Sequence, residues 1–187
     1  MIETKVKRIA IAGSHSCGKT SLVHELSKEL VGYPVVEEVA SLFPREIRSC
    51  METQCAIMRL QIDKERRCRP LMLSDRTVMD NSAYTFLCYD EGSRTDNDIA
   101  LLKMNEERFG KHMMGKPYDL VIFVDELLPI EDNNSRCLNP YYQTLIFNNL
   151  RVIIDNVYKR YGGFDVLNVK GIMDERMESI KSYLIEH

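Results

Sequence analysis

The stretch that decides the fold is IAIAGSHSCGKT, residues 9–20. Its first residues form a continuous apolar run, which is the pattern of a strand buried on both faces. Residues 13–20 then match G-x-x-x-x-G-K-[ST], in which the glycines let the backbone turn sharply and its amides converge on a phosphate. Apolar residues at helical spacing follow over 19–31. A strand, a glycine loop and a helix in this order predict a phosphate-binding loop.

The residues of this loop have expected roles in binding a nucleotide and Mg²⁺. The loop amides and the positive end of the helix that follows would hold the phosphates of a nucleotide. Lys19 would reach the β- and γ-phosphates of ATP, and Thr20 would ligate Mg²⁺. His15 and Cys17 are interpreted as neutral fillers of the loop. The predicted nucleotide-binding residues are Gly13, Ser14, His15, Ser16, Cys17, Gly18, Lys19, Thr20 and Ser21.

The composition is that of a globular protein of ordinary size. The chain has 187 residues, of which 44% are hydrophobic and 28% are charged, and this suits one domain over 1–187. A net charge of -3 disfavours a dedicated nucleic-acid binder. Apolar runs fall short of the roughly 18–20 residues of a membrane span, so we expect a cytoplasmic protein without a membrane partner. The 6 cysteines show no Cys-x-x-Cys spacing and are interpreted as reduced thiols.

Strand-like and helix-like patterns alternate along the chain. Strands are predicted over 7–12, 34–38, 71–75, 119–125 and 164–169, and helices over 19–31, 50–68, 77–89, 97–113, 141–161 and about 174–185. Ser49 with Glu52 predicts a capping box, and Asn139-Pro140 predicts an N-cap followed by proline. This alternation is typical of an α/β fold, with helices on both faces of a parallel sheet. A polar segment at about 126–139 interrupts the alternation and is interpreted as a lid.

Acidic residues stand at the ends of the predicted strands, where ligands of parallel sheets gather. We expect Asp75 to help hold Mg²⁺ and Arg76 to bind an acceptor phosphate or hydroxyl. Neighbouring residues in a strand face opposite sides, so one of Glu37 and Glu38 would face the cleft. Glu38 is preferred as the group that accepts the proton of an acceptor hydroxyl, with Glu37 as the alternate.

Further candidates follow from helical spacing and from the lid. Asp80 and Tyr84 share a helical face with Arg76 and would contact the acceptor, although core packing explains Tyr84 equally well. Arg136 would close over ATP and stabilise the moving phosphoryl group. The predicted catalytic residues are Lys19, Glu38, Asp75 and Arg136, the predicted substrate contacts are Glu37, Glu38, Arg76, Asp80 and Tyr84, and the predicted metal ligands are Thr20 and Asp75.

Taken in order, GSHSCGKT, VVEEVASLF, LSDRTVMDNSAY and a polar segment with an arginine resemble the P-loop nucleoside and nucleotide kinases. The chain is most similar to the ribosylnicotinamide-kinase-like branch with a small AAA-type ATPase domain, and it has thymidylate-kinase-like features. The resemblance implies a three-layer P-loop NTPase fold, with a five-stranded parallel sheet of order 2-3-1-4-5, and an ATP donor. Thr77 and Asp80 depart from the thymidylate kinase pattern. The glycine that usually comes before the lid arginine is also missing. The resemblance therefore does not fix the identity of the acceptor.

Two classes of function fit these motifs best, and a third, a nucleotide-binding protein that acts on RNA ends, is disfavoured by the acidic balance of the chain. The leading hypothesis is ATP- and Mg²⁺-dependent phosphoryl transfer to a small nucleoside-like or nucleotide acceptor. For a monophosphate acceptor a base is hardly needed, and Arg76 becomes the main contact. The alternative is a P-loop ATPase or regulatory switch coupled to a protein partner, which needs a residue to orient water, and Gln54 and Gln61 are weak candidates. Helices 97–113 and 141–161 could supply a homodimer face.

Overall fold

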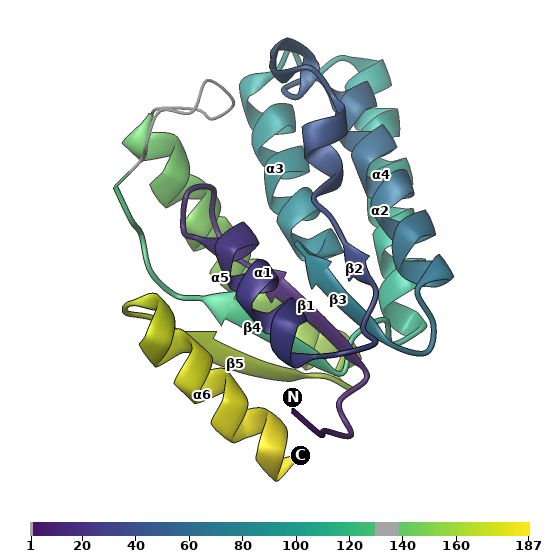
Figure 1. Ribbon diagram of the computed structural model, residues 1–187. Coiled ribbons are helices and arrows are strands. Elements are labelled where there is room, and N and C mark those ends of the chain that lie inside the picture. The colour runs from purple at the N-terminus through teal and green to yellow at the C-terminus, as the bar shows by residue number, and fades with distance from the viewer. Residues whose placement is uncertain (1, 130–138) are drawn as a thin grey trace.

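A computed structural model describes residues 2–129 and 139–187 (Figure 1). Within these ranges five parallel strands form one sheet in the order β2-β3-β1-β4-β5. The predicted fold class and strand order are therefore confirmed. The strands are β1 (Arg8–Ala12), β2 (Val35–Val36), β3 (Met72–Asp75), β4 (Leu120–Val124) and β5 (Asp165–Val169).

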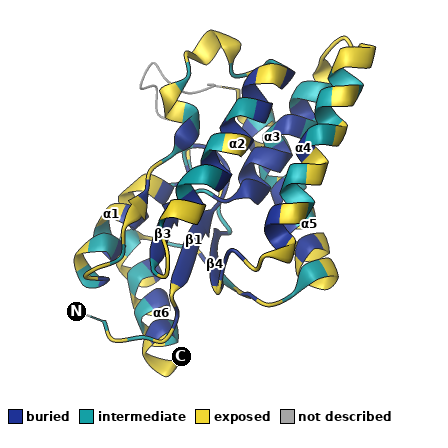
Figure 2. Ribbon diagram, turned by 90° about the vertical axis from the view of Figure 1, so that its right-hand side faces the viewer, coloured by how far each residue is buried: buried dark blue, intermediate teal, exposed yellow. Residues whose placement is uncertain are grey.

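Helices cover both faces of this sheet. They are α1 (Lys19–Glu29), α2 (Met51–Arg67), α3 (Val78–Glu91), α4 (Asp96–Met114), α5 (Pro140–Tyr161) and α6 (Met173–Glu186), and two short 3-10 turns, η1 (Val39–Leu42) and η2 (Arg45–Ile47), precede α2. Figure 1 shows α1 and α6 on one side of the strands, and Figure 2 shows the buried strands lying between helices.

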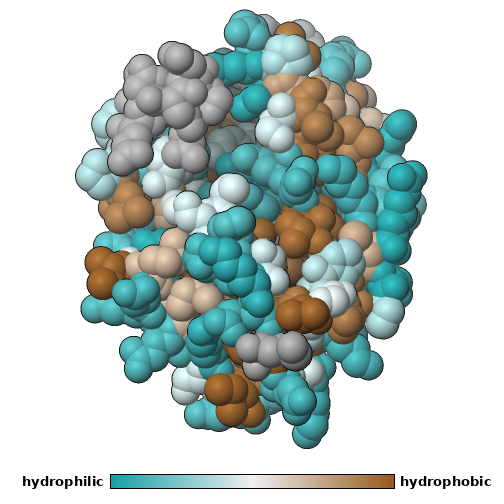
Figure 3. Space-filling model, viewed as in Figure 1, coloured by the Kyte–Doolittle hydropathy of each residue, from teal (hydrophilic) through white to brown (hydrophobic). Residues whose placement is uncertain are grey.

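The alternation of side chains along β1 explains the three layers. Ile9 and Ile11 belong to the core under α1 and α6, whereas Ala10 and Ala12 belong to the core under α2, α3 and α5. Because successive residues of a strand face opposite sides, one apolar run supplies both cores. On the surface in the orientation of Figure 1, hydrophobic residues form small patches among hydrophilic ones (Figure 3).

The boundaries of the elements depart from the sequence pattern in two places. Cys50, not Ser49, precedes the first turn of α2 and forms no side-chain cap. The expected capping box is wrong, because Cys50 is the N-cap residue of α2, and Oε1 of Glu52 accepts from Nδ2 of Asn97 on α4 at 3.0 Å instead. β2 ends at Val36, so the expected strand 34–38 is too long. The predicted cap of α5 is confirmed, since Oδ1 of Asn139 accepts from a backbone N–H of the first turn at 3.0 Å.

The sheet also sets where a ligand can approach. β1 and β3 pair in register so that Ile11 lies opposite Asp75, and the carboxyl ends of both strands reach the same edge. The loop after β1 and the turn after β3 are therefore neighbours.

Cysteines 17, 50, 55, 68 and 88 are free thiols, and Cys137 lies outside the described residues. Among the helices described, none is long and apolar enough to cross a membrane.

Candidate active site

The phosphate loop, residues 13–20, joins β1 to α1 and is crowded at its start. A Cβ added to Gly13 would lie 2.8 Å from Sγ of Cys17 and 3.3 Å from Cβ of Val124. Gly18 has a φ of 85°, a left-handed conformation that side chains disfavour, and it leads directly into α1. No side chain caps the first turn of α1. The N–H groups of this turn therefore remain available to an anion.

Lys19 lies within the loop and not in solvent. Its Nζ donates to the carbonyl oxygen of Ser14 and lies 3.5 Å from Sγ of Cys17. The residue is 5% exposed. The ammonium group is thus held against the loop that would surround the phosphates. Ser21, by contrast, is exposed on α1.

Thr20 and Asp75 meet at the carboxyl edge of the sheet. Oγ1 of Thr20 donates to Oδ2 of Asp75 at 2.7 Å. Oδ1 of Asp75 is buried and has no hydrogen-bond partner among the described residues. Burial raises the pKa of the Asp75 carboxyl, and the hydrogen bond from Thr20 opposes this shift. A buried carboxylate oxygen beside a hydroxyl fits Mg²⁺, whose remaining ligands are usually water and phosphate oxygens.

The backbone of Arg76 is fixed in an unusual conformation. Its φ is 97°, in a region that costs an L-residue about 1–3 kcal/mol. The Arg76 N–H donates to the carbonyl oxygen of Ile11 at 3.0 Å. The Arg76 carbonyl accepts from Oγ of Ser74 at 2.8 Å and from Nε2 of Gln61 at 3.4 Å. These bonds hold the turn between β3 and α3 in the conformation that directs the Arg76 side chain to the cavity described below.

Arg76 and Glu38 form an ion pair at the edge of the sheet. Nε of Arg76 donates to Oε1 of Glu38 at 2.5 Å, and its guanidinium carbon lies 5.5 Å from the ring centroid of Tyr84. The Arg76 guanidinium holds the pKa of Glu38 below its usual range, against burial, which would raise it. Glu38 immediately precedes η1, whereas its neighbour Glu37 is exposed and does not line the cavity.

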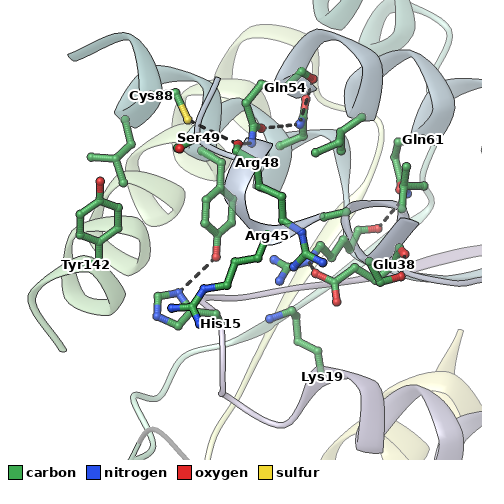
Figure 4. Close-up of a pocket in the computed structure, with 18 of the residues that line it drawn as sticks. His15, Lys19, Glu38, Arg45, Arg48, Ser49, Gln54, Gln61, Cys88 and Tyr142 are labelled. Atoms are coloured by element: carbon green, nitrogen blue, oxygen red, sulfur yellow. Dashed lines mark hydrogen bonds and ion pairs between the residues drawn. The ribbon is translucent and has the colours of Figure 1, made fainter. Parts of the chain in front are cut away.

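A cavity of about 660 Å³ extends from the phosphate loop along α3. Segments η1, η2 and α2 contribute to its lining on one side and α3 on the other, with Tyr142 added from α5. Figure 4 shows Lys19, Glu38 and His15 at one end of the cavity and Cys88 at the other. The loop that would bind a nucleotide and the Glu38–Arg76 pair therefore open into one space.

Of the two substrate contacts predicted on α3, Asp80 and Tyr84, only Tyr84 lines the cavity. Asp80 is fully buried and does not line the cavity. It accepts from the N–H of Gly13 at 3.2 Å and completes a capping box with Thr77, so it ties the phosphate loop to the start of α3. Tyr84 does line the cavity, and its hydroxyl lies 3.2 Å from Nδ1 of His15. Burial raises the pKa of Tyr84 to about 12.

Two of the sequence predictions concern the lid. Arg136 and residues 130–138 of the expected lid lie outside the described residues. Residues 126–129 are described and contain no helix or strand. The catalytic part expected of Arg136 therefore stays a prediction.

Most of the chain matches a known protein family. The family model described as AAA domain matches residues 8–176, from β1 into α6. The chain belongs to the AAA domain family. The matched range includes the phosphate loop and the Glu38–Arg76 pair. No curated protein matches the chain in sequence.

Solved structures share the fold of this AAA domain. Deoxyadenosine kinase from M. mycoides with bound dCTP is 18% identical, with a TM-score of 0.69 over 96% of this chain and 99% of that one. Thymidylate kinase from Candida albicans is 16% identical, with a TM-score of 0.65 over 97% of this chain and 90% of that one. The NadR protein in complex with NAD and AMP-PNP is 16% identical, with a TM-score of 0.70 over 97% of this chain and 50% of that one. The family match and the shared fold confirm the resemblance to P-loop kinases that the sequence motifs indicated.

The cavity of the AAA domain contains two arginines that the sequence did not reveal. Arg45 starts η2 and Arg48 follows its end, and both line the cavity. Nε of Arg48 donates to the carbonyl oxygen of Phe43 at 2.8 Å. Residues 39–49 carry neither a helical nor a strand period, so no pattern marked these arginines. The feature that could have indicated them is their position in the sequence shortly after the end of β2, where ligands of parallel sheets bind.

A buried polar network supports the same wall of the AAA domain. Nε2 of Gln61 donates to Oε1 of Glu65 at 2.9 Å. Glu65 is fully buried, with Oε2 2.6 Å from Nε2 of His112 and Oε1 accepting from the Tyr118 hydroxyl at 2.9 Å. The Tyr118 oxygen in turn accepts from the N–H of Val78 at 3.0 Å. The network therefore reaches both ends of the turn between β3 and α3.

Arg176 of α6 supports the phosphate loop of the AAA domain from outside the cavity. Its Nη1 donates to the carbonyl oxygen of Cys17 at 2.8 Å, and its Nη2 pairs with Oε2 of Glu126 at 3.0 Å. Arg176 is 3% exposed. Hydrogen bonds from the N–H of Gly171 and from Arg176 hold the pKa of Glu126 below its usual range. Sequence reasoning missed Arg176, because a single arginine on a helix has no distinctive pattern.

Proposed function

We propose that this protein transfers the γ-phosphoryl group of ATP, with Mg²⁺, to a small nucleoside-like or nucleotide acceptor. The observation that supports the proposal is that Lys19 and the Glu38–Arg76 pair line one cavity. A hydrolytic switch needs the phosphate loop, whereas a transferase also needs an acceptor site beside it. The membership of the AAA domain family accounts for nucleotide binding.

The donor side of the proposed reaction uses the phosphate loop. Lys19 and the loop amides hold the triphosphate and offset its charge. Thr20 and Asp75 hold Mg²⁺, which when bound neutralises charge on the transferred group. Residues 1–187 act as one unit, and the lid at about 126–139 brings Arg136 over the donor. This lid function rests on the sequence pattern, since 130–138 lie outside the described residues.

The acceptor side uses residues from the second and third strand ends. Glu38 accepts the proton or orients the hydroxyl of a nucleoside-like acceptor, and Arg76 holds the phosphate of a nucleotide acceptor. Tyr84 lines the cavity beside them. Solved structures of the same fold are named for kinases of deoxyadenosine, a nucleoside, and of thymidylate, a nucleotide. This supports the proposed range of acceptors.

The ATPase-switch hypothesis gains no support from the glutamines. Gln61 lines the cavity, but its Nε2 donates to a buried carboxylate, a hydroxyl and a backbone carbonyl. Nε2 of Gln54 donates to the carbonyl oxygen of Arg48 at 2.6 Å. Both side-chain amides are thus engaged in holding the wall, which disfavours a part in orienting water.

The proposal is tested by measuring ADP release with MgATP against a panel of nucleosides and nucleoside 5′-monophosphates. We expect at least one acceptor to stimulate turnover well above hydrolysis by water. Lys19→Ala should lower this turnover by about 100-fold or more, since a preorganised positive charge is lost. Its circular dichroism spectrum should stay unchanged. Lys28→Ala is the matched control, because Lys28 is exposed and pairs with Glu25 on the surface of α1. Absence of stimulation by every acceptor would contradict the kinase function.

A further inference from the structure

One side-chain oxygen in the wall of the cavity is buried without a hydrogen bond. It is Oδ1 of Asn81, which has no partner among the described residues. Asn81 is 6% exposed and lines the cavity from α3. A buried acceptor without a donor costs free energy, and each such group in a folded protein calls for a physical reason. An oxygen in the lining of a cavity can receive its donor from the molecule that fills the cavity.

The neighbouring hydrogen bonds decide which atom of the Asn81 amide is left without a partner. Nε2 of Gln54 donates to the carbonyl oxygen of Arg48 at 2.6 Å, so Oε1 of Gln54 is the atom turned toward Asn81. Nδ2 of Asn81 donates to this Oε1 at 3.0 Å and lies 3.4 Å from the carbonyl oxygen of Gln54. Exchanging the nitrogen and the oxygen of the Asn81 amide would set its oxygen against two other oxygens. The atom without a partner is therefore an acceptor, and a ligand must supply the donor.

The same bonds hold the Asn81 oxygen in place before any acceptor binds. Gln54 lies on α2 and is 4% exposed. The amide of Asn81 cannot turn over to offer its NH₂ group to a ligand without giving up its bonds to Gln54. An asparagine in solvent can present either atom, whereas this one presents its oxygen alone. Such fixed polarity allows a side chain to discriminate between ligands.

Asn81 lies where the ring of a nucleoside-like acceptor would fit. The N-cap residue Thr77, then Asn81 and Tyr84 of α3, line the cavity in succession. Asn81 follows Thr77 by one helical turn, about 6 Å along the axis. Figure 4 shows Gln54, the partner of Asn81, on the side of the cavity away from Lys19. An acceptor whose reacting oxygen faces the phosphate loop therefore extends its other end toward this amide.

We propose that Asn81 selects acceptors whose ring carries an exocyclic amino group, which donates to Oδ1. This inference rests on the proposed kinase function and deepens it by naming the class of acceptor. An amino group projects from the edge of a ring and can reach a recessed oxygen. A carbonyl at the same ring position would set two acceptors against each other, and a hydrogen atom there would leave Oδ1 without a partner. A ring N–H stands beside a carbonyl in uracil and hypoxanthine, so these rings bring the same conflict.

The decisive measurement compares kcat/KM for matched acceptors with the unmodified protein. Adenosine is paired with purine riboside, which has hydrogen in place of the amino group, and with inosine, which has a carbonyl. Cytidine is paired in the same way with pyrimidin-2-one riboside and with uridine. All are supplied both as nucleosides and as 5′-monophosphates. We expect the preferred amino compound to exceed both of its partners by about 10-fold or more, since the partners leave a buried acceptor unpaired.

The outcomes of this comparison separate the two proposals. Equal or better use of a compound that lacks the amino group would overturn the selection by Asn81 and leave the kinase function standing. Transfer to no acceptor at all would overturn the kinase function itself.

A pair of variants tests the oxygen atom directly. Asn81→Leu removes the acceptor atom and keeps a side chain of similar size, so the preference for the amino compound should fall about 10-fold while the KM for ATP changes by less than about 3-fold. Asn105→Leu is the matched control. Asn105 on α4 is 2% exposed and its Oδ1 also has no partner among the described residues, yet it does not line the cavity. An unchanged preference in Asn81→Leu, or an equal fall in Asn105→Leu, would contradict the assignment, and if Asn81→Leu fails to fold, the comparison of acceptors with the unmodified protein still decides it.

Discussion

Tyr118→Phe removes one oxygen atom from the network beneath the cavity and should destabilise the protein markedly. Tyr118 is fully buried, and its hydroxyl both donates to Glu65 at 2.9 Å and accepts from the N–H of Val78 at 3.0 Å. A buried N–H left without a partner costs about 1–3 kcal/mol, and a hydrogen bond to a charged group contributes about 1.5–3 kcal/mol. Glu65 keeps its contacts with Gln61 and His112, so the lower values apply. We expect a loss of about 2.5 kcal/mol in the free energy of unfolding.

Equilibrium unfolding in urea measures this loss. With a slope of about 2–3 kcal/mol/M, the midpoint should fall by about 1 M and the slope should stay constant. Tyr158→Phe is the control, because Tyr158 is 49% exposed and its substitution should change the unfolding free energy by less than about 0.5 kcal/mol. If both variants shift the midpoint equally, the hydroxyl of Tyr118 does not carry the stability assigned to it.

Three further predictions concern the edge of the sheet. Because burial raises the pKa of Asp75, its ionised form destabilises the fold above that pKa, so Asp75→Asn should raise the Tm at neutral pH. The same variant should weaken Mg²⁺-dependent ATP binding by about 10–100-fold in calorimetry, and unchanged affinity would exclude Asp75 from the metal site. Gly13→Ala should cost about 1–3 kcal/mol by crowding Cys17, and a second substitution, Cys17→Ala, should recover part of the loss in thermal unfolding. Since Arg76 lowers the pKa of Glu38, that acid stabilises the fold above about pH 4.3 and the contribution disappears as pH falls through the lowered pKa. The difference in unfolding free energy between the natural protein and Glu38→Gln should therefore shrink on acidification, and a difference that grows would contradict the ion pair.

Local patterns predicted the parts of this molecule that local forces determine. The strand, glycine loop and helix of residues 9–31 were evident because each part has its own signature in composition and spacing. The cap formed by Asn139 was predicted because it depends on residues within one turn. The parallel sheet followed from the alternation of strands and helices, whereas the order of its strands came from the family resemblance alone.

Contacts between distant segments account for what was missed. Glu52 matched a capping box, yet Asn97 on another helix engages its carboxylate. Arg45 and Arg48 stand on short turns without a period, and the fold of β2 and α2 places them at the cavity. Arg176 reaches the phosphate loop across more than 150 residues, since its bond to Cys17 spans a separation of 159. Sequence spacing carries no information about such pairs.

The bond between Arg176 and the carbonyl oxygen of Cys17 also bears on how the protein can be handled. α6 is the final helix, and Figure 1 draws the two chain ends near each other, beside the lower end of α6. A shortened version that ends before residue 173 would keep every motif of the nucleotide site and still lack the brace behind it. If such a version failed to bind ATP, the cause would be the lost support of the phosphate loop and not the loss of a nucleotide-binding residue. The smallest nucleotide-binding unit is therefore better mapped with point substitutions in α6 than with deletions.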